Sequence, residues 1–272
     1  MHPLHRYSAK MIAVWLGVLL LAAAPAGAAD GPAEAAGERM VFRIAYGNVP
    51  LAEATLWLRQ HGSRYEVSGE GGTSGPLEWL FDWKGRVRTE GRLDRGGLFP
   101  ELHDQHGIWR GETRQAQVRY GADRSIVHVV EPPLDPLEFT PVPEGSIAGT
   151  MDPLTAALSA LKHFAATGRC HGTLPIFDGR RRYDMLLEDA GTALLIRDRP
   201  WNYGGRAHGC RLKSHRIGGF FKRDEDEPSD DAPQSERLVW LAELAPGSWR
   251  PVRFEVDAPL GKFIGRAVLA DE

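Results

Sequence analysis

The stretch GTMDPLTAALSALKHFAATGRCHGTLPIFDGRRRYDM, residues 149–185, combines a strong helix signal with a strong hairpin signal. Asp152 can accept a hydrogen bond from a free backbone N–H of the first turn, and Pro153 sits at the first helical position, where its missing N–H costs little. Gly168 is the residue type that commonly ends a helix. The stretch therefore predicts an α-helix over residues 152–166, capped by Asp152. Its apolar positions recur with a helical period and form a stripe that must be buried: Leu154, Ala157, Leu158, Leu161 and Ala165.

The rest of the chain is typical of antiparallel strands. Asp178-Gly179 is a hairpin signal between the apolar segments 174–177 and 183–187. Elsewhere, apolar and polar side chains alternate with a period of two, which indicates strands with one buried and one wet face. Asp189-Ala190-Gly191 is interpreted as a turn and the proline-rich segment 131–148 as a crossing loop. Further strands are predicted at residues 41–46, 54–59, 64–68, 85–93, 98–108, 113–120, 125–130, 192–198, 206–217, 236–244, 250–257 and 262–270.

Strands greatly outnumber helices, and the two do not alternate regularly along the chain. This order disfavours a doubly wound sheet and an eight-fold αβ barrel. The helix must bury its stripe against something, most simply the sheet. We therefore expect a mainly β fold, a large curved antiparallel sheet or open barrel wrapped around one long α-helix. Residues 40–272 are expected to form this single domain, with the helix 152–166 inserted.

Residues 1–28 have the pattern of a signal peptide. A positive start and an apolar run over residues 11–24 precede the small residues Ala26-Gly27-Ala28. An uncleaved membrane anchor is the alternative, but the run is shorter than the ~20 apolar residues that a span needs. The cleavage site has no cysteine, which disfavours a lipoprotein. We expect export, cleavage near Ala28, no stable membrane anchor afterwards, and a flexible leader over residues 29–39.

Charge argues against several kinds of partner. Removing residues 1–28, which contain Arg6 and Lys10, leaves 244 of the 272 residues and changes the formal charge from −3 to −5. Basic and acidic residues are interspersed, so the sequence indicates neither a nucleic-acid surface nor a polybasic membrane patch. The acidic, polar segment 224–234 is expected to be a solvated loop.

The sequence contains two cysteines, Cys170 and Cys210, and in an exported chain they predict one disulfide. Closing a loop of about forty residues would stabilise the fold by roughly 3 to 4 kcal/mol. A zinc site that adds His171 and His208 is an alternative, since two cysteines and two histidines can complete a tetrahedral shell. However, adjacent residues such as Cys170 and His171 face opposite sides of a strand. Free thiols are the third alternative. We predict the disulfide, with no metal or cofactor site.

Arg180, Arg181 and Arg182 follow the hairpin signal. Guanidinium groups grip phosphate or carboxylate groups with paired hydrogen bonds, so these arginines are candidates for contact with an anion or a partner. The alternative is a structural turn whose arginines pair with acidic residues of the same chain, such as those of residues 224–231. Alternation along a strand would also separate Arg181 from the other two.

Catalytic motifs are absent from the sequence, which has no G-x-S-x-G elbow, P-loop, H-E-x-x-H or G-x-G-x-x-G. This absence disfavours catalysis without excluding it. His163 lies one position off the apolar stripe and is interpreted as a surface or boundary residue. Aromatic residues could line a cavity for an acyl chain or a glycan, although core packing is their commoner role; the set is Trp57, Trp79, Phe81, Trp83, Trp109, Trp201, Tyr203, Trp240 and Trp249.

Several motifs together resemble one known family. GTMDPLTAAL is followed by the first cysteine, FDGRRRYDM, the second cysteine and IGGFF. This order is similar to the pattern of domain-of-unknown-function family 3108, exported proteins of Gram-negative bacteria. YGNVPLAEATLWLRQHGSRYEVSGEGGTSG and LFPELH resemble the opening strands of that family, so the resemblance covers nearly the whole mature chain. It implies a periplasmic protein of unknown activity and brings no catalytic residues. More remotely, the fold is similar to the lipoprotein carriers LolA and LolB, which use several helices where this sequence predicts one.

We therefore expect a non-enzymatic periplasmic protein that binds an apolar small molecule or an envelope protein and supports cell-envelope integrity. The export signal, the aromatic residues and the lack of catalytic motifs favour this function. A hydrolase or transferase acting on envelope material is the second hypothesis, with Asp178, Asp184 or His163 as acid or base, and it requires these groups to converge in a cleft. A structural protein–protein interaction module, with residues 180–182 as its contact, is the third.

Overall fold

The computed structural model describes residues 37–75, 83–94, 97–109, 111–222, 236–258 and 261–269. The signal peptide, the acidic loop 224–234 and two of the predicted aromatic residues, Trp79 and Phe81, lie outside these residues. Within the described part, one helix, α2 (Pro153–Thr167), accompanies thirteen strands. The strands are β1 (Glu38–Tyr46), β2 (Val49–His61), β3 (Arg64–Thr73), β4 (Trp83–Asp94), β5 (Gly97–Trp109), β6 (Glu112–Tyr120), β7 (Ile126–Glu131), β8 (Gly172–Phe177), β9 (Arg182–Leu195), β10 (Gly205–Gly218), β11 (Arg237–Ala245), β12 (Ser248–Ala258) and β13 (Gly261–Val268).

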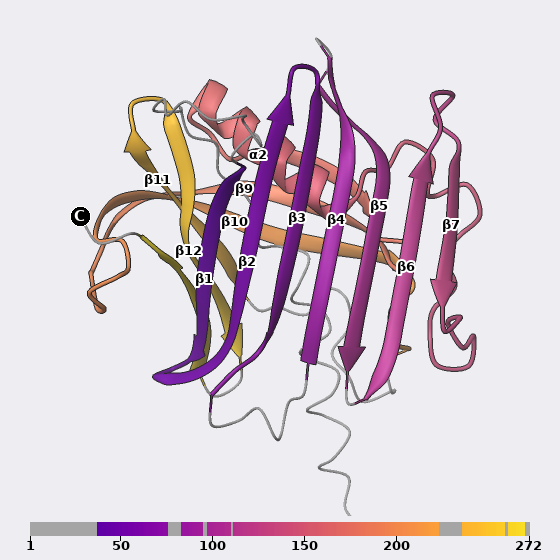
Figure 1. The fold of residues 1–272 in the computed structure, drawn as a ribbon, viewed down its shortest axis with the longest axis horizontal. Helices are drawn as coiled ribbons and strands as arrows, with labels where there is room; N and C mark the ends of the chain where they lie inside the picture. Colours follow the sequence, from indigo (N-terminus) through magenta and orange to yellow (C-terminus); the bar gives the residue numbers. More distant parts are fainter. Residues whose placement is uncertain are drawn as a thin grey trace, which may run out of the picture.

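All thirteen strands form one antiparallel sheet whose edge strands are β7 and β8. The order β7-β6-β5-β4-β3-β2-β1-β13-β12-β11-β10-β9-β8 consists of two meanders of consecutive hairpins, β1–β7 and β8–β13. The meanders join where β1 pairs with β13, so that Phe42 lies opposite Ala267. Figure 1 shows the first meander in front and strands of the second passing behind α2. The predicted mainly β fold with a curved antiparallel sheet around one helix is confirmed, and the sheet is open.

α2 forms where the sequence predicts it. Asp152 is its N-cap, and Gly168 ends it in the left-handed conformation with a φ of 67°. α2 contacts β4 and β5 of the first meander and β8 and β12 of the second, so strands cover more than one side of the helix. This wide enclosure explains why burial extends beyond the predicted stripe to Ala156 and Phe164. The predicted buried stripe is wrong at one position, Ala165, which is exposed.

The core consists of apolar side chains from both meanders packed around α2. The larger cluster joins Leu154, Leu158, Leu161 and Phe164 of the helix to residues such as Phe42, Leu56, Val67, Phe254 and Val256. A second cluster joins Ala156 to β8, β9 and β10 through Ile176, Tyr183, Met185, Leu187 and Leu212. The concave face of the sheet therefore holds the buried apolar groups, as period-two alternation implies.

β9 corrects one prediction. The sequence predicts a turn at Asp189-Ala190-Gly191 and a separate strand at 192–198, but β9 continues through these residues to Leu195. The register between β9 and β10 shifts between His208 and Cys210, which marks a β-bulge. Gly191 has a φ of 73°, and glycine supplies such a conformation without strain. The glycine therefore marks a bulge inside a strand instead of the end of one.

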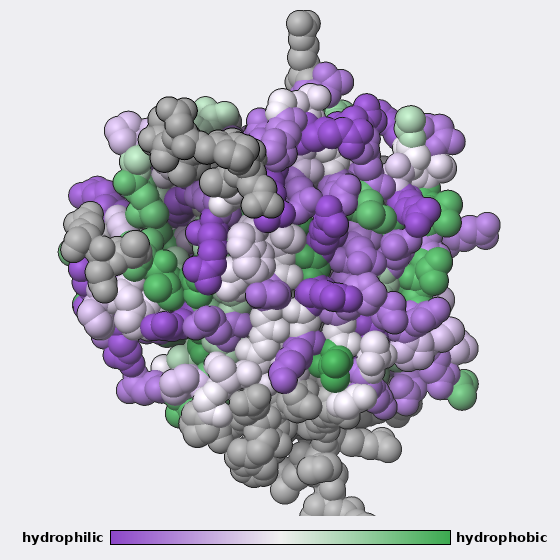
Figure 2. All heavy atoms as spheres, viewed as in Figure 1, coloured by the Kyte–Doolittle hydropathy of each residue, from purple (hydrophilic) through white to green (hydrophobic). Residues whose placement is uncertain are grey.

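β1 begins at Glu38, so the last two residues of the predicted leader 29–39 belong to the sheet. Figure 2 shows a mainly hydrophilic outer face, with apolar residues in separate small groups. Exposed aliphatic residues include Val127 and Val129 of the edge strand β7. In the described part of the chain, no helix combines the length and apolar character needed to cross a bilayer.

Candidate functional site

Asp152 is completely buried where α2 meets the first meander. Its Oδ1 accepts hydrogen bonds from the backbone N–H groups of Leu154 at 2.9 Å and Thr155 at 3.0 Å, which confirms the predicted cap. The Thr89 hydroxyl on β4 donates to the same oxygen at 2.7 Å, and the Thr155 hydroxyl donates to Oδ2 at 2.6 Å. Burial alone would raise the pKa of Asp152, but the hydrogen bond and charge of His103, together with Thr155, hold it below its ordinary value. The carboxylate therefore stays charged inside the core.

His103 of β5 is the second ionisable group in this network. Its Nδ1 lies 2.8 Å from Thr89 Oγ1 and 3.4 Å from Asp152 Oδ1. Because the Thr89 hydroxyl already donates to Asp152, its oxygen must accept from His103, so Nδ1 carries a proton. The other ring nitrogen, Nε2, is buried and finds no hydrogen-bond partner among the described residues.

Tyr65 of β3 extends the network to a third strand. Its hydroxyl lies 2.7 Å from the hydroxyl oxygen of Thr155. Burial, together with the nearby charge of Asp152, raises the pKa of Tyr65, so its hydroxyl stays protonated. Gly91 of β4 makes room for this ring, because a Cβ there would lie 2.5 Å from the Tyr65 hydroxyl oxygen and closer still to the carbonyl oxygen of Phe99. Three neighbouring strands thus fix the start of α2.

Replacing Gly91 with alanine is expected to lower the free energy of unfolding by about 1 to 3 kcal/mol, the usual cost of overpacking a filled core. The added methyl group would displace Tyr65 from Thr155 and press on the backbone of β5. Urea unfolding followed by circular dichroism measures the change. Gly107→Ala is the matched control, since a Cβ at Gly107 would meet nothing closer than 3.5 Å. Equal losses in the two variants would contradict the prediction.

The predicted arginine cluster lies at the tip of the β8–β9 hairpin, and its partners belong to the same chain. The buried carboxylate of Asp178 accepts from the backbone N–H groups of Arg180 at 2.9 Å and Arg181 at 2.7 Å. The guanidinium group of Arg181 pairs with the same carboxylate at 2.8 Å. Arg182 donates to the carbonyl of Ser146 at 2.7 Å and pairs with Asp184 at 2.6 Å. These contacts support the structural-turn alternative.

Arg180 connects the hairpin to the opposite edge of the sheet. Its Nη2 donates to the backbone carbonyls of Glu131 at 2.6 Å and Pro132 at 3.1 Å, at the end of β7. From β5, the Gln105 side chain donates to the carbonyl of Asp178 at 2.7 Å. Side chains therefore bridge the two edges of the open sheet at this end. The predicted contact of Arg180, Arg181 and Arg182 with an anion or a partner stays a prediction.

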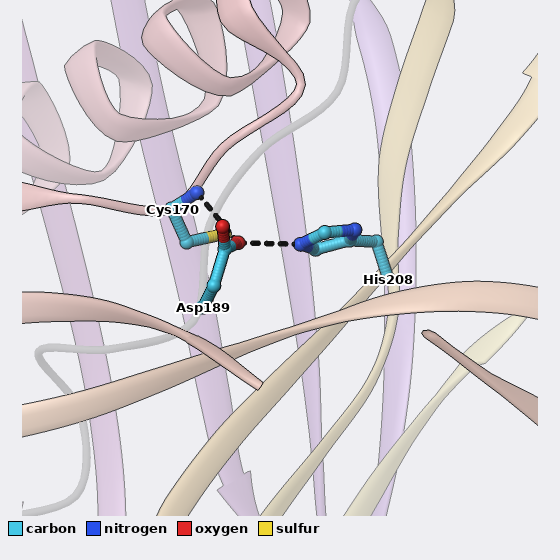
Figure 3. A group of neighbouring side chains, drawn as sticks. All are labelled: Cys170, Asp189 and His208. Atoms are coloured by element: carbon cyan, nitrogen blue, oxygen red, sulfur yellow. Dashed lines mark hydrogen bonds and ion pairs between the residues drawn. The ribbon is translucent and has the colours of Figure 1, made fainter. Parts of the chain in front are cut away.

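Cys170 and Cys210 form the predicted disulfide, with their Cα atoms 5.5 Å apart. The bond joins the segment after α2 to β10, and both cysteines are buried. Asp189 of β9 accepts from the N–H of Cys170 at 2.9 Å and lies 2.6 Å from Nε2 of His208 (Figure 3). The hydrogen bonds from Cys170 and His208 lower the pKa of Asp189, and Arg169 adds to this effect. The oxidised pair leaves no thiolate for the alternative zinc site with His171 and His208.

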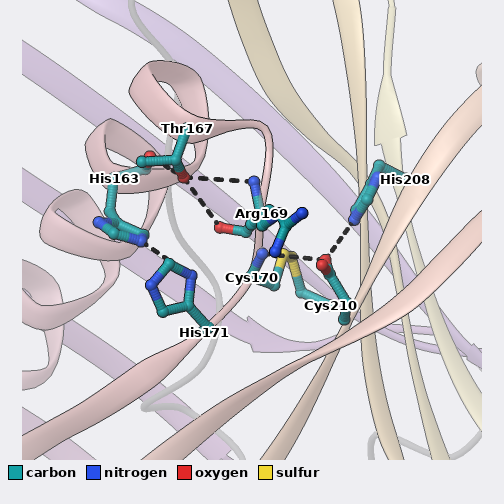
Figure 4. The surroundings of a disulfide bond; sticks show 8 residues. His163, Thr167, Arg169, Cys170, His171, His208 and Cys210 are labelled. Atoms are coloured by element: carbon teal, nitrogen blue, oxygen red, sulfur yellow. Dashed lines mark hydrogen bonds and ion pairs between the residues drawn. A yellow bond between two sulfur atoms is a disulfide. The ribbon is translucent and has the colours of Figure 1, made fainter.

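The proposed acid and base groups are not brought together. His163, near the end of α2, lies beside His171, with Nε2 and Nδ1 3.2 Å apart (Figure 4). Asp178 follows β8 whereas His171 precedes it. The two ends of this six-residue strand lie roughly 20 Å apart, and so do Asp178 and His171. Asp184 is paired with Arg182. The second hypothesis requires these groups to converge, and the structure places Asp178 and His163 at opposite ends of β8.

A partly open apolar cavity of about 70 Å³ lies between α2 and the second meander. Its helix side consists of Pro153 and the small residues Ala156, Ala157 and Ala160, which leave space against the sheet. Both cysteines of the disulfide also line it. The remaining lining residues are Leu174, Ile176, Met185, Leu187, Leu212, Val239 and Leu241. None of the described aromatic residues of the predicted set is in this lining; Trp249, for example, packs on Phe164 with ring centroids 4.9 Å apart.

The sequence matches the profile of one known protein family. Residues 41–268 match the profile of the family described as "Protein of unknown function (DUF3108)". The chain belongs to this family. The match spans both meanders and α2, and it confirms the family resemblance that the motifs indicate. No curated protein matches the sequence.

A similar solved structure is that of a "beta-barrel-like protein of domain of unknown function DUF1849" from Brucella abortus. It is 11% identical to this DUF3108 chain, with a TM-score of 0.50, and the match covers 87% of this chain and 97% of the other. At this identity the likeness shows the fold alone. The more remote similarity to lipoprotein carriers stays a prediction.

Proposed function

We propose that the protein is a non-enzymatic binding protein of the periplasm, which holds the end of an apolar chain between α2 and β8–β11 and supports the integrity of the cell envelope. The observation that carries this proposal is the partly open apolar cavity. Binding sites for small molecules are concave and mostly apolar, and this cavity is lined by aliphatic residues, methionine and the disulfide.

The size of the cavity limits how large a group of the ligand it can hold. A dry cavity of ~150 Å³ accepts benzene, and the volume here is about 70 Å³. The volume therefore favours a narrow alkyl chain over an aromatic ring. A volume about half that of the benzene cavity accommodates about half of the six carbon atoms of benzene, two or three. Each contributes about 0.8 kcal/mol, so the ligand is the narrow end of an alkyl chain, held with modest affinity.

The periplasmic location rests on two features. Residues 1–28 have the pattern of a signal peptide. The disulfide between Cys170 and Cys210 supports the same compartment, because disulfides persist where the environment is oxidising. An exported protein that binds alkyl chains meets them in membrane lipids and lipoproteins, which connects the cavity to the envelope.

Filling the cavity tests the function. Ala160→Leu places a larger side chain in the cavity from its helix wall, and we expect it to weaken binding of cis-parinaric acid at least about ten-fold. The loss of two or three buried methylenes, about 2 kcal/mol, corresponds to this range. Fluorescence titration of the purified mature protein measures the dissociation constant, and displacement by dodecanoate measures binding of an unlabelled chain.

Ala165→Leu is the matched control, because Ala165 is exposed on the same helix. It makes the same chemical change away from the cavity and is expected to bind the probe like the wild-type protein. Urea unfolding establishes that both variants fold. The proposal is overturned if the wild-type protein does not bind the probe, or if folded Ala160→Leu binds it as tightly as Ala165→Leu.

A further inference from the structure

The surroundings of the disulfide contain four side chains of the types that bind transition metals. Cys170, Asp189 and His208 each offer one ligand atom, and these three atoms lie within 4.8 Å of one another. Cys210 adds the sulfur that is bonded to Cys170. Figure 3 shows Asp189 between Cys170 and His208. The four residues come from the segment after α2, from β9 and from β10, so the fold brings together groups that are distant in the sequence.

We propose that reduction of the disulfide converts this cluster into a Zn²⁺ site with Cys170, Cys210, His208 and Asp189 as ligands. Zinc accepts thiolate, imidazole and carboxylate ligands in a tetrahedron, with Zn–S distances of about 2.3 Å and Zn–N and Zn–O distances of about 2.0 to 2.2 Å. These bond lengths require ligand atoms about 3.3 to 3.8 Å apart. The ligand atoms of Cys170, Asp189 and His208 already lie within 4.8 Å of one another, so shifts of about 1 Å bring these three to the required spacing, and breaking the S–S bond lets the Cys210 sulfur move away from that of Cys170 to become the fourth ligand.

The chemistry is a two-electron reduction followed by an exchange of protons for metal. A dithiol reductant gives two electrons and two protons to the S–S bond and becomes a disulfide itself. Zn²⁺ then displaces the protons of the two protein thiols, which pass to water, and binds the neutral imidazole and the carboxylate. In the oxidised chain neither sulfur is a thiolate, so the site cannot bind Zn²⁺ while the disulfide is intact.

The surroundings fit such a site. The side chain of Asp189 is 42% exposed and that of His208 is 16% exposed, so the ion reaches the buried sulfurs from the Asp189 side. The ring of Phe164 lies 4.8 Å from the imidazole of His208 and restricts its orientation. The charge of Arg169 acts on Asp189 and offsets the negative charge of two thiolates and a carboxylate around one divalent ion.

Cobalt titration of the full mature protein tests the proposal. After reduction with a phosphine and removal of oxygen, we expect one Co²⁺ per chain, with thiolate-to-cobalt charge-transfer absorption and the d–d bands of a tetrahedral ion, both lost when Zn²⁺ is added. The oxidised protein should show neither band. His208→Ala and Asp189→Asn should each weaken binding to the reduced protein at least about ten-fold.

A double variant, His163→Ala with His171→Ala, is the control, because this neighbouring imidazole pair could bind metal on its own. It should leave the cobalt spectrum unchanged. The proposal is overturned if the reduced protein gives no charge-transfer band, or if His208→Ala binds Co²⁺ as tightly as the wild-type protein. If the chain unfolds on reduction, its two cysteines would bind Co²⁺ without His208, and His208→Ala would then bind as tightly as the wild-type protein. This case therefore also overturns the proposal.

Discussion

Asp152→Ala is expected to lower the free energy of unfolding by about 3 to 5 kcal/mol, the usual cost of removing one partner from a buried charged network. The change removes the acceptor of four donors, the backbone N–H groups of Leu154 and Thr155 and the hydroxyls of Thr89 and Thr155. Each buried donor left without a partner costs about 1 to 3 kcal/mol, and the costs are not additive. Urea unfolding at neutral pH, followed by circular dichroism, measures the loss.

Asp152→Asn is the matched control, because asparagine caps helices about as well as aspartate but has no charge. It should retain more stability than Asp152→Ala. The folded pKa of Asp152 is lowered from 3.8, so its charge contributes stability that is present above this pH and is lost as pH falls through the folded value. The wild-type protein should therefore lose stability more steeply than Asp152→Asn below about pH 4. A loss under about 1 kcal/mol in Asp152→Ala would refute the account.

The second large effect concerns the disulfide. Replacing Cys170 and Cys210 together with alanine is expected to lower the free energy of unfolding by about 3 to 4 kcal/mol, because the bond closes a loop with a sequence separation of 40 residues. The open chain gains conformational freedom in the unfolded state that the crosslinked chain lacks. Urea unfolding of the oxidised wild-type protein and the double variant gives the difference.

Reduction of the wild-type protein with a phosphine, in the presence of a metal chelator, is the control for packing. Both sulfurs remain in place but the crosslink is gone, so the reduced protein should be destabilised to a similar extent as the double variant. If the reduced protein keeps the stability of the oxidised form while the double variant loses it, the side chains and not the crosslink stabilise the fold.

The fold was largely predictable because each element has a local signal. The sequence around Asp152, Pro153 and Gly168 gave both ends of α2 through cap and termination chemistry. Period-two alternation gave most strands, and Asp178-Gly179 gave the hairpin after β8. The signal failed at Gly191, because a glycine with positive φ serves a turn and a bulge equally well, and only the pairing of β9 with β10 decides between them.

The site was less predictable, because its contacts are long-range. Asp152 was identified as a cap, but its partners Thr89 and His103 come from strands far away in the sequence. A polar residue at an inward position of a predicted strand, as Thr89 is in residues 85–93, was a usable signal. Asp189 and His208 were recognisable as ionisable, but their approach to the disulfide depends on the register of two strands. The cavity had no sequence signal beyond the alanines of α2.

The join between β1 and β13 has a consequence for how the protein is made. Each meander consists of hairpins between neighbouring segments, which close short loops at small entropic cost. Among the described residues the strands of the two meanders pair through the β1–β13 ladder, from Val41 opposite Val268 to Tyr46 opposite Phe263, and this ladder closes nearly the whole described chain into one loop. Contacts of such high separation slow folding. During synthesis the central ladder of the sheet must wait for its last strand, β13, so the sheet can be completed only after nearly all of the described chain has been made.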